Sequence, residues 1–600
     1  MIDDSDSDSW SISSSGLVIE EGEEDLLNRK EEVLFQKCVD SDAGDKASSG
    51  ALMMAFQSMG ILKNDPRLKP LIKKLKSLKK DKPRGLFRSI HDINMDVQDF
   101  SKVVRECPLL ISKLAEGNFV IPEFKEFCSD IVDIFEKCEG ETSGTPADYI
   151  QQLARADPTK WGVSLCTIDG QRFSVGDTEE RFSMQSVSKP FTYGLCMKDL
   201  GCDEVMNHIG HEPSGRAFDE ILMDHNNKPH NPMVNSGAIM SAALLLYKVK
   251  PELSLSEKFE YVHKFFTNMA GGMYVGFQTA TFLSEKESAD RNNALAYLMR
   301  EKGCFPKPRQ GKVDIKDILD LYFQTCSLEV NCESLSIMAG TLANGGKCPI
   351  TGEWVLDSET VQHILSLMYS CGMYNYSGQF AFQVGLPSKS GVSGVVIVIV
   401  PDVVGFAMYS PNVDHIGNSV RGVKFAQELV KIYNFHTFQS VVGGYEKKNP
   451  RSRKYEDHSV QIVKLLQAAC VGDVETLERA YAEGMDMNLK DYDNRTALHL
   501  ASCEGHVGCV KFLIDVGKVD INVKDRWGRT PLDEASNASI INILKRHKAK
   551  LEQSKPQSLE PYTSGRGSAE NNIEISRPGA VLLDEITAKI EKFKVEERSV

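Results

Sequence analysis

The sequence has 600 residues, which is too long for one ordinary domain and predicts roughly three to five structural units. Hydrophobic residues make up 41% and charged residues 26%, as in soluble globular proteins, and no apolar run approaches the ~20 residues that a membrane-spanning helix needs. The formal net charge of −14 disfavours general nucleic-acid binding, so we expect neither a membrane span nor a nucleic-acid partner.

The cysteines and the N-terminus indicate the compartment. The 15 cysteines are an odd number and include no Cys-x-x-Cys pair, which favours a reducing compartment and excludes a disulfide framework or a cysteine-based zinc site. His208 and His211 form a His-x-x-His pair without a glutamate motif, so packing is favoured over a metal. The stretch Met1–Asp8 resembles neither a signal peptide nor a transit peptide. We therefore expect a cytoplasmic protein, with a mitochondrial one as the alternative.

The first 140 residues divide into a tail and a helical region. Residues 1–24 are rich in Ser, Asp and Glu and predict a disordered acidic tail. Residues 25–140 have helical periodicity, with Leu71 and Leu75 placed between lysines. The lysine run within 73–82 could contact a membrane or a nucleic acid, but a solvated helix face is the favoured interpretation.

Residues 40–51 resemble an EF-hand calcium loop only in part. The sixth position of such a loop would be Asp45, where glycine is required. The twelfth would be Ala51, where a bidentate glutamate is required. The sequence therefore predicts a helical, EF-hand-like domain over 25–140 that does not bind calcium.

Residues 141–438 mix strands and helices without a regular alternation, which favours an α+β layered domain. A strand pair is predicted over 385–400. Its second half, Val395–Val400, is a continuous β-branched run that is typical of a strand covered on both faces.

Beyond a polar, charged linker at 439–458, the sequence repeats itself. The stretch 491–499 recurs 34 residues later at 525–533, with Asp, Arg, Thr and Leu at matching places, and this period resembles ankyrin repeats over 459–550. Such repeats bury their apolar faces by stacking. They either only extend the fold or offer a surface to a protein partner. Residues 551–600 predict a mostly disordered tail with a short helix.

Ser186 and Lys189 form a Ser-x-x-Lys motif. On a helix the two side chains share one face, so the amine can approach the hydroxyl. A serine hydroxyl is a poor nucleophile until a neighbouring base takes its proton. Ser183 has no lysine three residues on, and Ser188 would point away from Lys189. The motif by itself occurs by chance in many proteins.

A second motif, Lys389-Ser390-Gly391, follows about 200 residues later. A Ser-x-x-Lys motif followed by a Lys-[Ser/Thr]-Gly strand is the arrangement of serine β-lactamases and penicillin-binding proteins. Glycine lets a strand approach closely, so a neighbouring main-chain N–H can serve an oxyanion hole. The two motifs together indicate a chemistry and a fold, but no substrate.

Several longer stretches agree with one family. They are Asp148–Leu153, Trp161–Ser164, Lys228–Ala238, Ser284–Asn292, Leu342–Gly346 and Cys371–Tyr374. These stretches resemble the phosphate-activated glutaminases, and the C-terminal ankyrin repeats fit the animal form. The resemblance covers roughly residues 25–550.

The resemblance implies hydrolysis of L-glutamine to L-glutamate and ammonia through a glutamyl-serine intermediate, as in glutamine catabolism and glutamate biosynthesis. It implies a β-lactamase-like core, with an antiparallel sheet and helices on both sides, beside the N-terminal helical domain and the ankyrin repeats. It also implies a homotetramer built from dimers, inorganic phosphate as an activator, and no metal or organic cofactor.

Carried over residue by residue, the resemblance makes Ser186 the nucleophile and Lys189 the residue that activates it. Val392 would add its backbone N–H to that of Ser186 in the oxyanion hole. Tyr322 and Tyr374 would lie in the same pocket, where a tyrosine near the serine can relay a proton. The remaining substrate-binding positions implied by the resemblance are Tyr149, Asn235, Glu285 and Asn292.

These residue types suit glutamine, although each also has a plainer interpretation. A carboxylate such as Glu285 suits the α-ammonium, and amides such as Asn235 and Asn292 can donate to the α-carboxylate. Without the resemblance, Glu285 would be a surface charge and Asn235 a helix cap. Tyr322 would be a core aromatic and Tyr149 an interhelical contact.

The sequence leaves two rival functions open, a penicillin-recognising serine hydrolase and an inactive ankyrin scaffold. A chromogenic β-lactam separates the first from a glutaminase, and ammonia release from glutamine separates the second. One position departs from the family. The vertebrate enzymes usually carry a lysine where this chain has Glu220, within the loop 215–224, which predicts weaker activation by phosphate or less dependence on it. The alternative is that phosphate binds elsewhere and Glu220 is only a surface charge.

Overall fold

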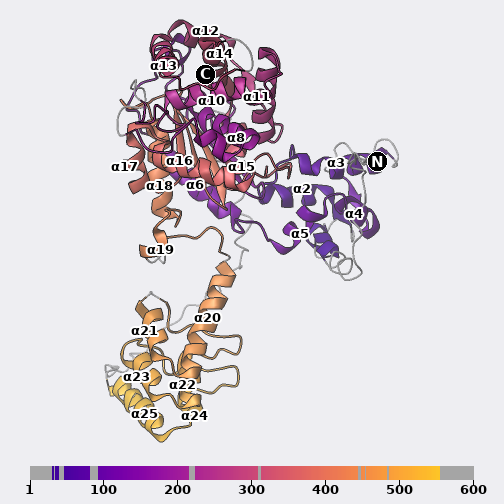
Figure 1. The fold of residues 1–600 in the computed structure, drawn as a ribbon. Helices are drawn as coiled ribbons and strands as arrows, with labels where there is room; N and C mark the ends of the chain where they lie inside the picture. The colour runs from indigo at the N-terminus through magenta and orange to yellow at the C-terminus, as the bar shows by residue number, and fades with distance from the viewer. Residues whose placement is uncertain are drawn as a thin grey trace, which may run out of the picture. The chain divides into compact units, whose positions relative to one another are not determined.

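The computed structural model describes residues 30–32, 34–39, 46–80, 92–214, 223–308, 312–442, 447–452, 454–482 and 485–553. The chain forms two compact units, residues 1–442 and 443–600, and each is treated by itself (Figure 1). The predictions for residues 1–24, for Glu220 and for a helix in the C-terminal tail lie outside the described residues, as do residues 40–45 of the loop at 40–51.

A five-stranded antiparallel sheet lies at the centre of the first unit, with strand order β4-β3-β10-β9-β8. The strands are β3 (Gly162–Thr167), β4 (Arg172–Gly176), β8 (Ser388–Gly391), β9 (Val395–Val400) and β10 (Val404–Tyr409). The strand pair predicted within 385–400 is therefore confirmed as β8 and β9, which pair in register from Ser388 opposite Val398 to Gly391 opposite Val395.

Strand β9 is buried on both faces, as its β-branched run predicts. Val395, Ile397 and Ile399 contribute to one apolar cluster, whereas the alternate residues Val396 and Val398 contribute to a second. Because successive side chains of a strand point to opposite faces, the two clusters lie on opposite sides of the sheet. The α+β core with helices on both faces is thus confirmed.

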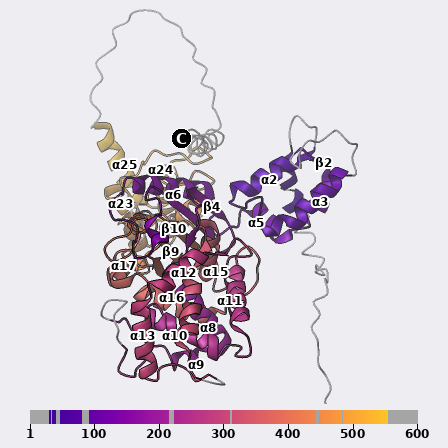
Figure 2. The same ribbon diagram turned by 90° about the horizontal axis from the view of Figure 1, so that it is seen from above.

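Helices cover both faces of the sheet. One face carries α6 (Phe124–Glu139) and α18 (Val420–Ile432). The other carries α15 (Cys332–Ala343), with further helices packed behind it. Figure 2 shows this order of layers, with α6 on one side of β9 and β10 and α15 on the other. The helices of the thicker layer are α8 (Ser188–Leu200), α10 (Asn235–Tyr247), α11 (Leu255–Met269), α14 (Ile315–Cys326) and α16 (Ser358–Cys371).

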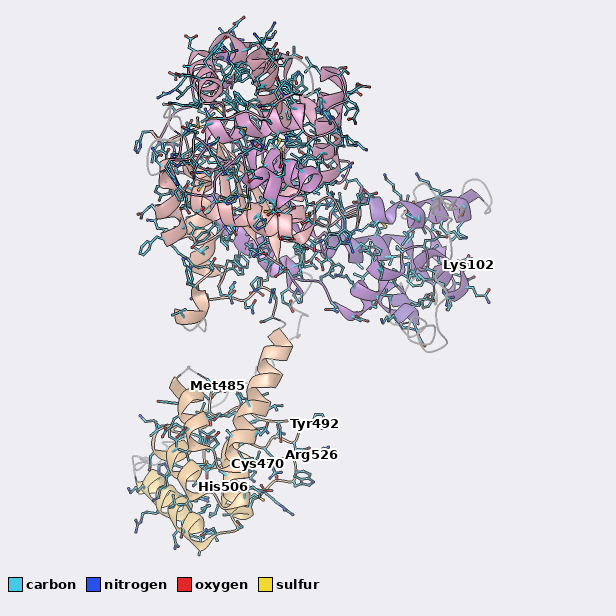
Figure 3. All side chains as sticks on the ribbon, viewed as in Figure 1. Lys102, Cys470, Met485, Tyr492, His506 and Arg526 are labelled. Atoms are coloured by element: carbon cyan, nitrogen blue, oxygen red, sulfur yellow. The ribbon has the colours of Figure 1, made fainter. Side chains whose placement is uncertain are left out.

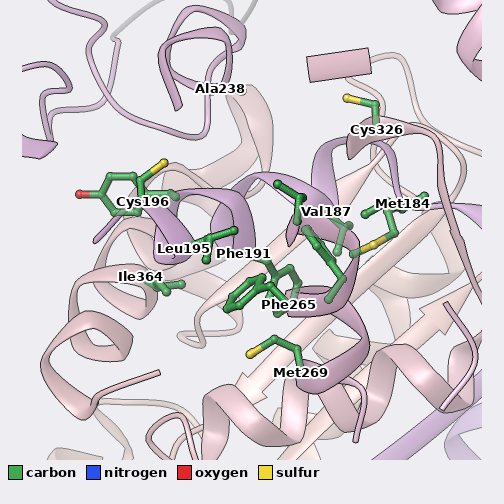
Figure 4. Close-up of a cluster of buried hydrophobic side chains, with 14 of the residues drawn as sticks. Met184, Val187, Phe191, Leu195, Cys196, Ala238, Phe265, Met269, Cys326 and Ile364 are labelled. Carbon is green, nitrogen blue, oxygen red and sulfur yellow. The ribbon is translucent and has the colours of Figure 1, made fainter. Parts of the chain in front are cut away.

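Helix α8 is buried along almost its whole length. In Figure 4, Phe191 and Leu195 of α8 lie among apolar side chains from α11 and α16, including Phe265 and Ile364. The helix has no strongly amphipathic pattern because apolar neighbours surround it. Residues at its N-terminal end are therefore held in place by the core of the unit.

Two glycines allow α15 to cross the sheet closely. A Cβ on Gly405 of β10 would lie 2.3 Å from the backbone nitrogen of Gly340 in α15. A Cβ on Gly340 would lie 3.0 Å from the carbonyl oxygen of Cys166 in β3. Any side chain at Gly405 would therefore push the helix off the sheet.

Short helices form the N-terminal region of the first unit. They are α2 (Ser49–Ser58), η1 (Pro66–Leu68), α3 (Lys69–Lys80), α4 (Val97–Val104) and α5 (Pro108–Glu116), with β1 (Ala47–Ser48) paired to β2 (Asn94–Met95). Leu71 and Leu75 of α3 are buried, whereas Lys73 and Lys76 are exposed. The helical periodicity around these leucines is confirmed.

Buried charges join this region to the β3–β4 hairpin. Asp65 is fully buried, and both of its carboxylate oxygens accept hydrogen bonds of 2.9 Å from the guanidinium of Arg67. Arg172 of β4 lies 3.4 Å from the same carboxylate, and Arg67 also donates to the carbonyl of Asp169 at 2.7 Å. Because a buried charge is costly unless it is paired, this group fixes the N-terminal helices to the core.

Smaller elements complete the first unit. They are α7 (Gln151–Ala154), β5 (Phe182–Ser183), η2 (Gln185–Val187), α9 (Cys202–Met206), β6 (Gly276–Phe277), α12 (Thr279–Glu287), α13 (Asp290–Glu301), β7 (Leu328–Val330), η3 (Tyr374–Tyr376), α17 (Ser377–Gln383) and α19 (Gln439–Val442). Strands β5, β7 and β6 form a separate sheet in that order. Among the described residues, no helix is both long and apolar enough to cross a membrane.

The second unit has the paired short helices of ankyrin repeats. They are α20 (Lys454–Val471), α21 (Val474–Ala482), α22 (Ala497–Glu504), α23 (Val507–Asp515), α24 (Pro531–Glu534) and α25 (Ala538–Gln553). The backbone N–H of Thr496 donates to Nδ1 of His499, and Nε2 of this buried ring lies 3.3 Å from the carbonyl of Arg529 in the next repeat. Ankyrin repeats in this unit are thus confirmed.

Candidate active site

Ser186 lies in a sharp turn between β5 and α8. The turn is the 3-10 segment η2, and Gln185 has a positive φ of 48°, which is uncommon for a residue with a side chain. Ser186 is partly exposed, whereas its neighbours Gln185 and Val187 are buried. Ser188 is buried, and its hydroxyl donates to the carbonyl of Gln185 at 2.7 Å. Ser186 is therefore the more accessible hydroxyl of the two.

Lys189 lies in the first turn of α8 and is 2% exposed. Its Nζ donates to Oδ1 of Asn235 at 2.7 Å and to the carbonyl of Met233 at 3.2 Å. Burial lowers the pKa of Lys189 to about 8, because the charged form loses its hydration and finds no carboxylate as a partner. About one tenth of this amine is therefore neutral at pH 7 and about one half at pH 8.

The end of β8 approaches the serine turn. A Cβ on Gly391 would lie 3.0 Å from the carbonyl oxygen of Met184, so glycine permits the close approach that its motif predicts. The hydroxyl of Ser393 donates to the carbonyl of Ser183 at 2.8 Å and fixes the two segments together. Val392 lies between these two anchors and is partly exposed.

Tyr374 lies with Ser186 and Val392. Burial raises the pKa of its hydroxyl, while hydrogen bonding with the Ser186 side chain and with the Val392 backbone acts in the opposite direction. The backbone of Tyr374 has a positive φ of 52°. The structure therefore brings three of the predicted residues to one point and holds one of them in a strained conformation.

Lys389 lies beneath the ring of Tyr374. Its Nζ is 4.6 Å from the ring centroid and donates to the carbonyl of Ser390 at 2.8 Å, and the residue is fully buried. Burial, followed by repulsion from Lys189, lowers the pKa of Lys389 well below its ordinary value. Sequence reasoning used Lys389 only as a motif and did not place it in the site.

Glu285 of α12 is a buried carboxylate at the site. It is 7% exposed, and its Oε1 accepts hydrogen bonds from the Tyr149 hydroxyl at 2.7 Å and from Nε2 of Gln185 at 3.0 Å. Burial raises the pKa of Glu285, and the two hydrogen bonds oppose that shift. The plainer interpretation of Glu285 as a surface charge is therefore wrong, and Gln185 joins the site although sequence reasoning missed it.

Tyr149 is half exposed overall, but its hydroxyl points inward to Glu285. Burial of the hydroxyl, then the Glu285 charge, raise the pKa of Tyr149 well above its usual range. The residue thus combines an accessible ring with a fixed polar end.

Asn235 and Asn292 are hydrogen-bonded to each other. Nδ2 of Asn235 donates to Oδ1 of Asn292 at 3.2 Å, while Oδ1 of Asn235 accepts from Lys189. Asn235 opens α10, but its side chain makes no cap bond there. The pair connects α10 and α13 to the lysine, so the plainer interpretation of Asn235 as a helix cap does not hold.

Tyr322 of α14 is buried beside the same group. Burial is the largest cause that raises the pKa of Tyr322 well above its usual range, and the nearby Cys326, Glu285 and Tyr374 raise this pKa further. It is therefore a core aromatic, as the plainer interpretation had it, and also a neighbour of the site. Cys326 is a buried thiol near Lys189 that no sequence motif indicated.

The histidine pair has ordinary partners. His211 lies 3.2 Å from the hydroxyl of Tyr193, and His208 lies 3.6 Å from the carboxylate of Glu204. Across the part of the chain that the structure describes, no group of three or more His, Cys, Asp or Glu residues is placed to hold a metal ion.

Three family models match the chain. The model described as Glutaminase matches residues 144–438, the model for ankyrin repeats matches residues 465–554, and an EF-hand domain model matches residues 30–122.

Individual proteins match as well. The Mus musculus protein named "Glutaminase liver isoform, mitochondrial" is 46% identical over 491 residues, which cover 82% of this chain and 79% of that protein. A glutaminase of Nostoc sp. is 41% identical over 315 residues, which cover 52% of this chain and 91% of that protein. A solved structure titled "Crystal Structure Analysis of Mglu in its native form" is 33% identical, covers 52% of this chain and 72% of that chain, and has a TM-score of 0.48.

The match to the mouse protein extends over more than two thirds of both chains, and the matched family model contains every residue of the site described above. The chain belongs to the glutaminase family, enzymes that hydrolyse L-glutamine to L-glutamate and ammonia.

Proposed function

We propose that this chain hydrolyses glutamine through a glutamyl ester on Ser186, with Lys189 as the base that activates it. The observation that carries the proposal is the buried amine of Lys189 in the first turn of α8, whose pKa is lowered to about 8 and which lies three residues beyond the partly exposed Ser186. A neutral amine next to a hydroxyl is the arrangement that general-base activation of serine requires.

In the first half-reaction, the neutral amine of Lys189 takes the proton of Ser186 Oγ while the oxygen attacks the side-chain amide carbon of glutamine. The resulting oxyanion accepts hydrogen bonds from the backbone N–H groups of Ser186 and Val392. Losing one such donor typically costs ~3–4 kcal/mol of transition-state stabilisation. The carbon–nitrogen bond then breaks, and the nitrogen takes a proton to leave as ammonia.

We assign Tyr374 to the relay that carries the proton of Ser186 to the leaving nitrogen. Its hydroxyl interacts with Ser186 and with the Val392 backbone, so it borders both the nucleophile and the oxyanion donors. In the second half-reaction, water attacks the ester and gives its proton to Lys189. The proton then returns to the oxygen of Ser186, which restores the hydroxyl. All atoms of glutamine and water then appear in glutamate and ammonia.

Glu285, Asn235 and Asn292 orient the substrate in this proposal. Glu285 accepts from the α-ammonium, because it is a buried carboxylate already held by two donors. Asn292 presents its carbonyl oxygen to Asn235, so its amide nitrogen is the group that can donate to the α-carboxylate. Tyr149 and Tyr322 shape the pocket around these groups.

Regulation and assembly follow as further proposals from the family resemblance. We expect a homotetramer built from dimers, and inorganic phosphate as an activator whose effect is weakened by Glu220. We propose domain bounds of 25–140, 141–438 and 459–550, and a protein partner for the ankyrin repeats. We propose the cytoplasm as the compartment, with the mitochondrion as the alternative.

The test is ammonia release by purified Ser186→Ala and Lys189→Ala variants. Each should lose several orders of magnitude in turnover while keeping the wild-type melting temperature within a few degrees. Ser188→Ala is the matched control, because Ser188 is a neighbouring hydroxyl that bonds to the carbonyl of Gln185, and it should keep most of the activity.

Trapping the ester gives a direct measure. Rapid acid quenching during turnover, followed by peptide mass spectrometry, should place one glutamyl group on Ser186 and none on Ser188. More than a tenth of wild-type turnover in the Ser186→Ala variant would contradict the assignment. Hydrolysis of a chromogenic β-lactam at a rate comparable with glutamine would contradict the substrate.

A further inference from the structure

Two turns of the ankyrin unit are fixed by aspartates that point inward. In the first, Oδ1 of Asp491 accepts from the backbone N–H groups of Asp493 and Arg495 at 2.9 and 2.8 Å. In the second, Oδ1 of Asp525 accepts from Trp527 and Arg529 at the same two distances. Because each carboxylate satisfies its own turn, the turns are rigid and present little negative charge outward.

A direct contact joins the two turns. The backbone N–H of Arg526 donates to the carbonyl of Asp493 at 2.8 Å, and Nη1 of Arg526 donates to the Asp493 carboxylate at 2.9 Å. The residues at the two tips are therefore held side by side as one surface.

This surface displays aromatic rings that the unit does not bury. Tyr492 is 91% exposed and Trp527 is 61% exposed, and neither belongs to the apolar core of the unit. The guanidinium of Arg526 lies 5.4 Å from the Tyr492 ring and 6.0 Å from the Trp527 ring. Figure 3 shows Tyr492 and Arg526 projecting from the edge of the unit, away from its helices.

The surroundings of these rings are basic. Lys490, Lys524 and Arg529 are exposed next to the two tips, whereas Asp491 and Asp525 are turned into their own loops. The carboxylate of Asp493 is paired with Arg526, so the charges next to the rings that have no ion-pair partner among the described residues are those of the two lysines and Arg529. Tyr, Trp and Arg are the residue types that most often dominate the binding energy of protein interfaces. The turns that carry these rings are fixed in advance by their own hydrogen bonds, which lowers the entropy lost on binding.

We propose that Tyr492, Arg526 and Trp527 form a docking surface for an acidic segment of a partner protein that carries an aromatic or branched apolar side chain. Charge complementarity selects this partner, because the exposed cations next to the rings favour carboxylates. A single-stranded nucleic acid could also stack on such rings. The chain has a net charge of −14, so it repels a nucleic acid with one negative charge per nucleotide more strongly than it repels a short peptide with a few carboxylates.

The experiment selects peptides from a displayed library of random 12-residue sequences on the full-length protein, with prior depletion on the Tyr492→Ala/Trp527→Ala double variant. The selected peptides should be rich in Asp and Glu around an aromatic or branched apolar residue. In fluorescence polarisation, a selected peptide should bind about tenfold or more weakly to the double variant. Its binding should also weaken between 50 and 200 mM NaCl.

Trp354→Ala is the matched control, because Trp354 is an equally exposed tryptophan of the first unit, and it should bind the peptide like the wild type. Equal glutamine turnover in all variants, together with an unchanged melting profile, excludes unfolding as the cause of lost binding. The proposal is overturned if no peptide is enriched, if the enriched peptides are basic, if the double variant binds them equally well, or if a 12-residue oligouridine binds more tightly than any peptide.

Discussion

Lys189 makes the rate of glutamine hydrolysis depend on pH in a defined direction. A general base acts in its neutral form, and the pKa of Lys189 is lowered to about 8. The neutral fraction is then about one eleventh at pH 7 and about one half at pH 8, so the rate constant kcat/KM should rise about fivefold between these values. Below pH 7 it should fall about tenfold per pH unit.

The assay is continuous ammonia detection between pH 6 and 8.5 at constant ionic strength and fixed phosphate concentration. Lys389→Met is an informative variant, because burial rather than the Lys389 charge lowers the pKa of Lys189. Its midpoint should stay near pH 8 even if its turnover falls through loss of contact with Tyr374. A wild-type profile that is flat between pH 6 and 8, with chemistry rate-limiting, would refute Lys189 as the base.

Three further predictions concern binding, stability and the second unit. Glu285→Gln should raise the KM for glutamine by about tenfold or more with a smaller loss of kcat, because a charge-assisted bond to the α-ammonium becomes a neutral one; steady-state kinetics measure this. Asp65→Asn should lower stability by about 3–5 kcal/mol, since it leaves Arg67 and Arg172 without their buried counter-charge, and denaturant unfolding of the full chain measures the loss. A chain ending at Val442 should keep wild-type turnover per subunit if its oligomeric state, measured by light scattering, is unchanged.

The sequence was most informative where local pattern and final environment agree. The β-branched run of β9 predicts burial on both faces, and the period of 34 residues predicts stacked repeats, because in each case the apolar pattern matches the geometry of the element. The spacing of Ser186 and Lys189 likewise predicts a helical segment, which the structure forms as the 3-10 turn η2 followed directly by α8. The chemistry proposed for them rests on the two residue types, on their spacing and on the family resemblance.

Long-range contacts were not available from such patterns. Gln185 bonds to Glu285, which lies 100 residues further along the chain, and only its position next to Ser186 could have suggested a role. Lys389 was visible as part of a motif, but its place beneath Tyr374 depends on how β8 packs against η3. The plainer interpretations of Glu285 and Asn235 failed for the same reason, since burial and partners are properties of the fold.

The features that local sequence rules miss are concentrated at this site. Gln185 and Tyr374 both have positive φ values, a conformation that typically costs of order 1–3 kcal/mol for a residue with a side chain. Lys189 and Lys389 are buried without a carboxylate partner, which is unfavourable for the charged amine. Such costs persist only where surrounding packing determines the conformation, and the closely packed α8 supplies that packing here. The same burial that opposes the lysine charge lowers the pKa of Lys189 to about 8, so that part of the amine is neutral and can act as a base near physiological pH. The unfavourable term in stability is therefore the source of the proposed reactivity.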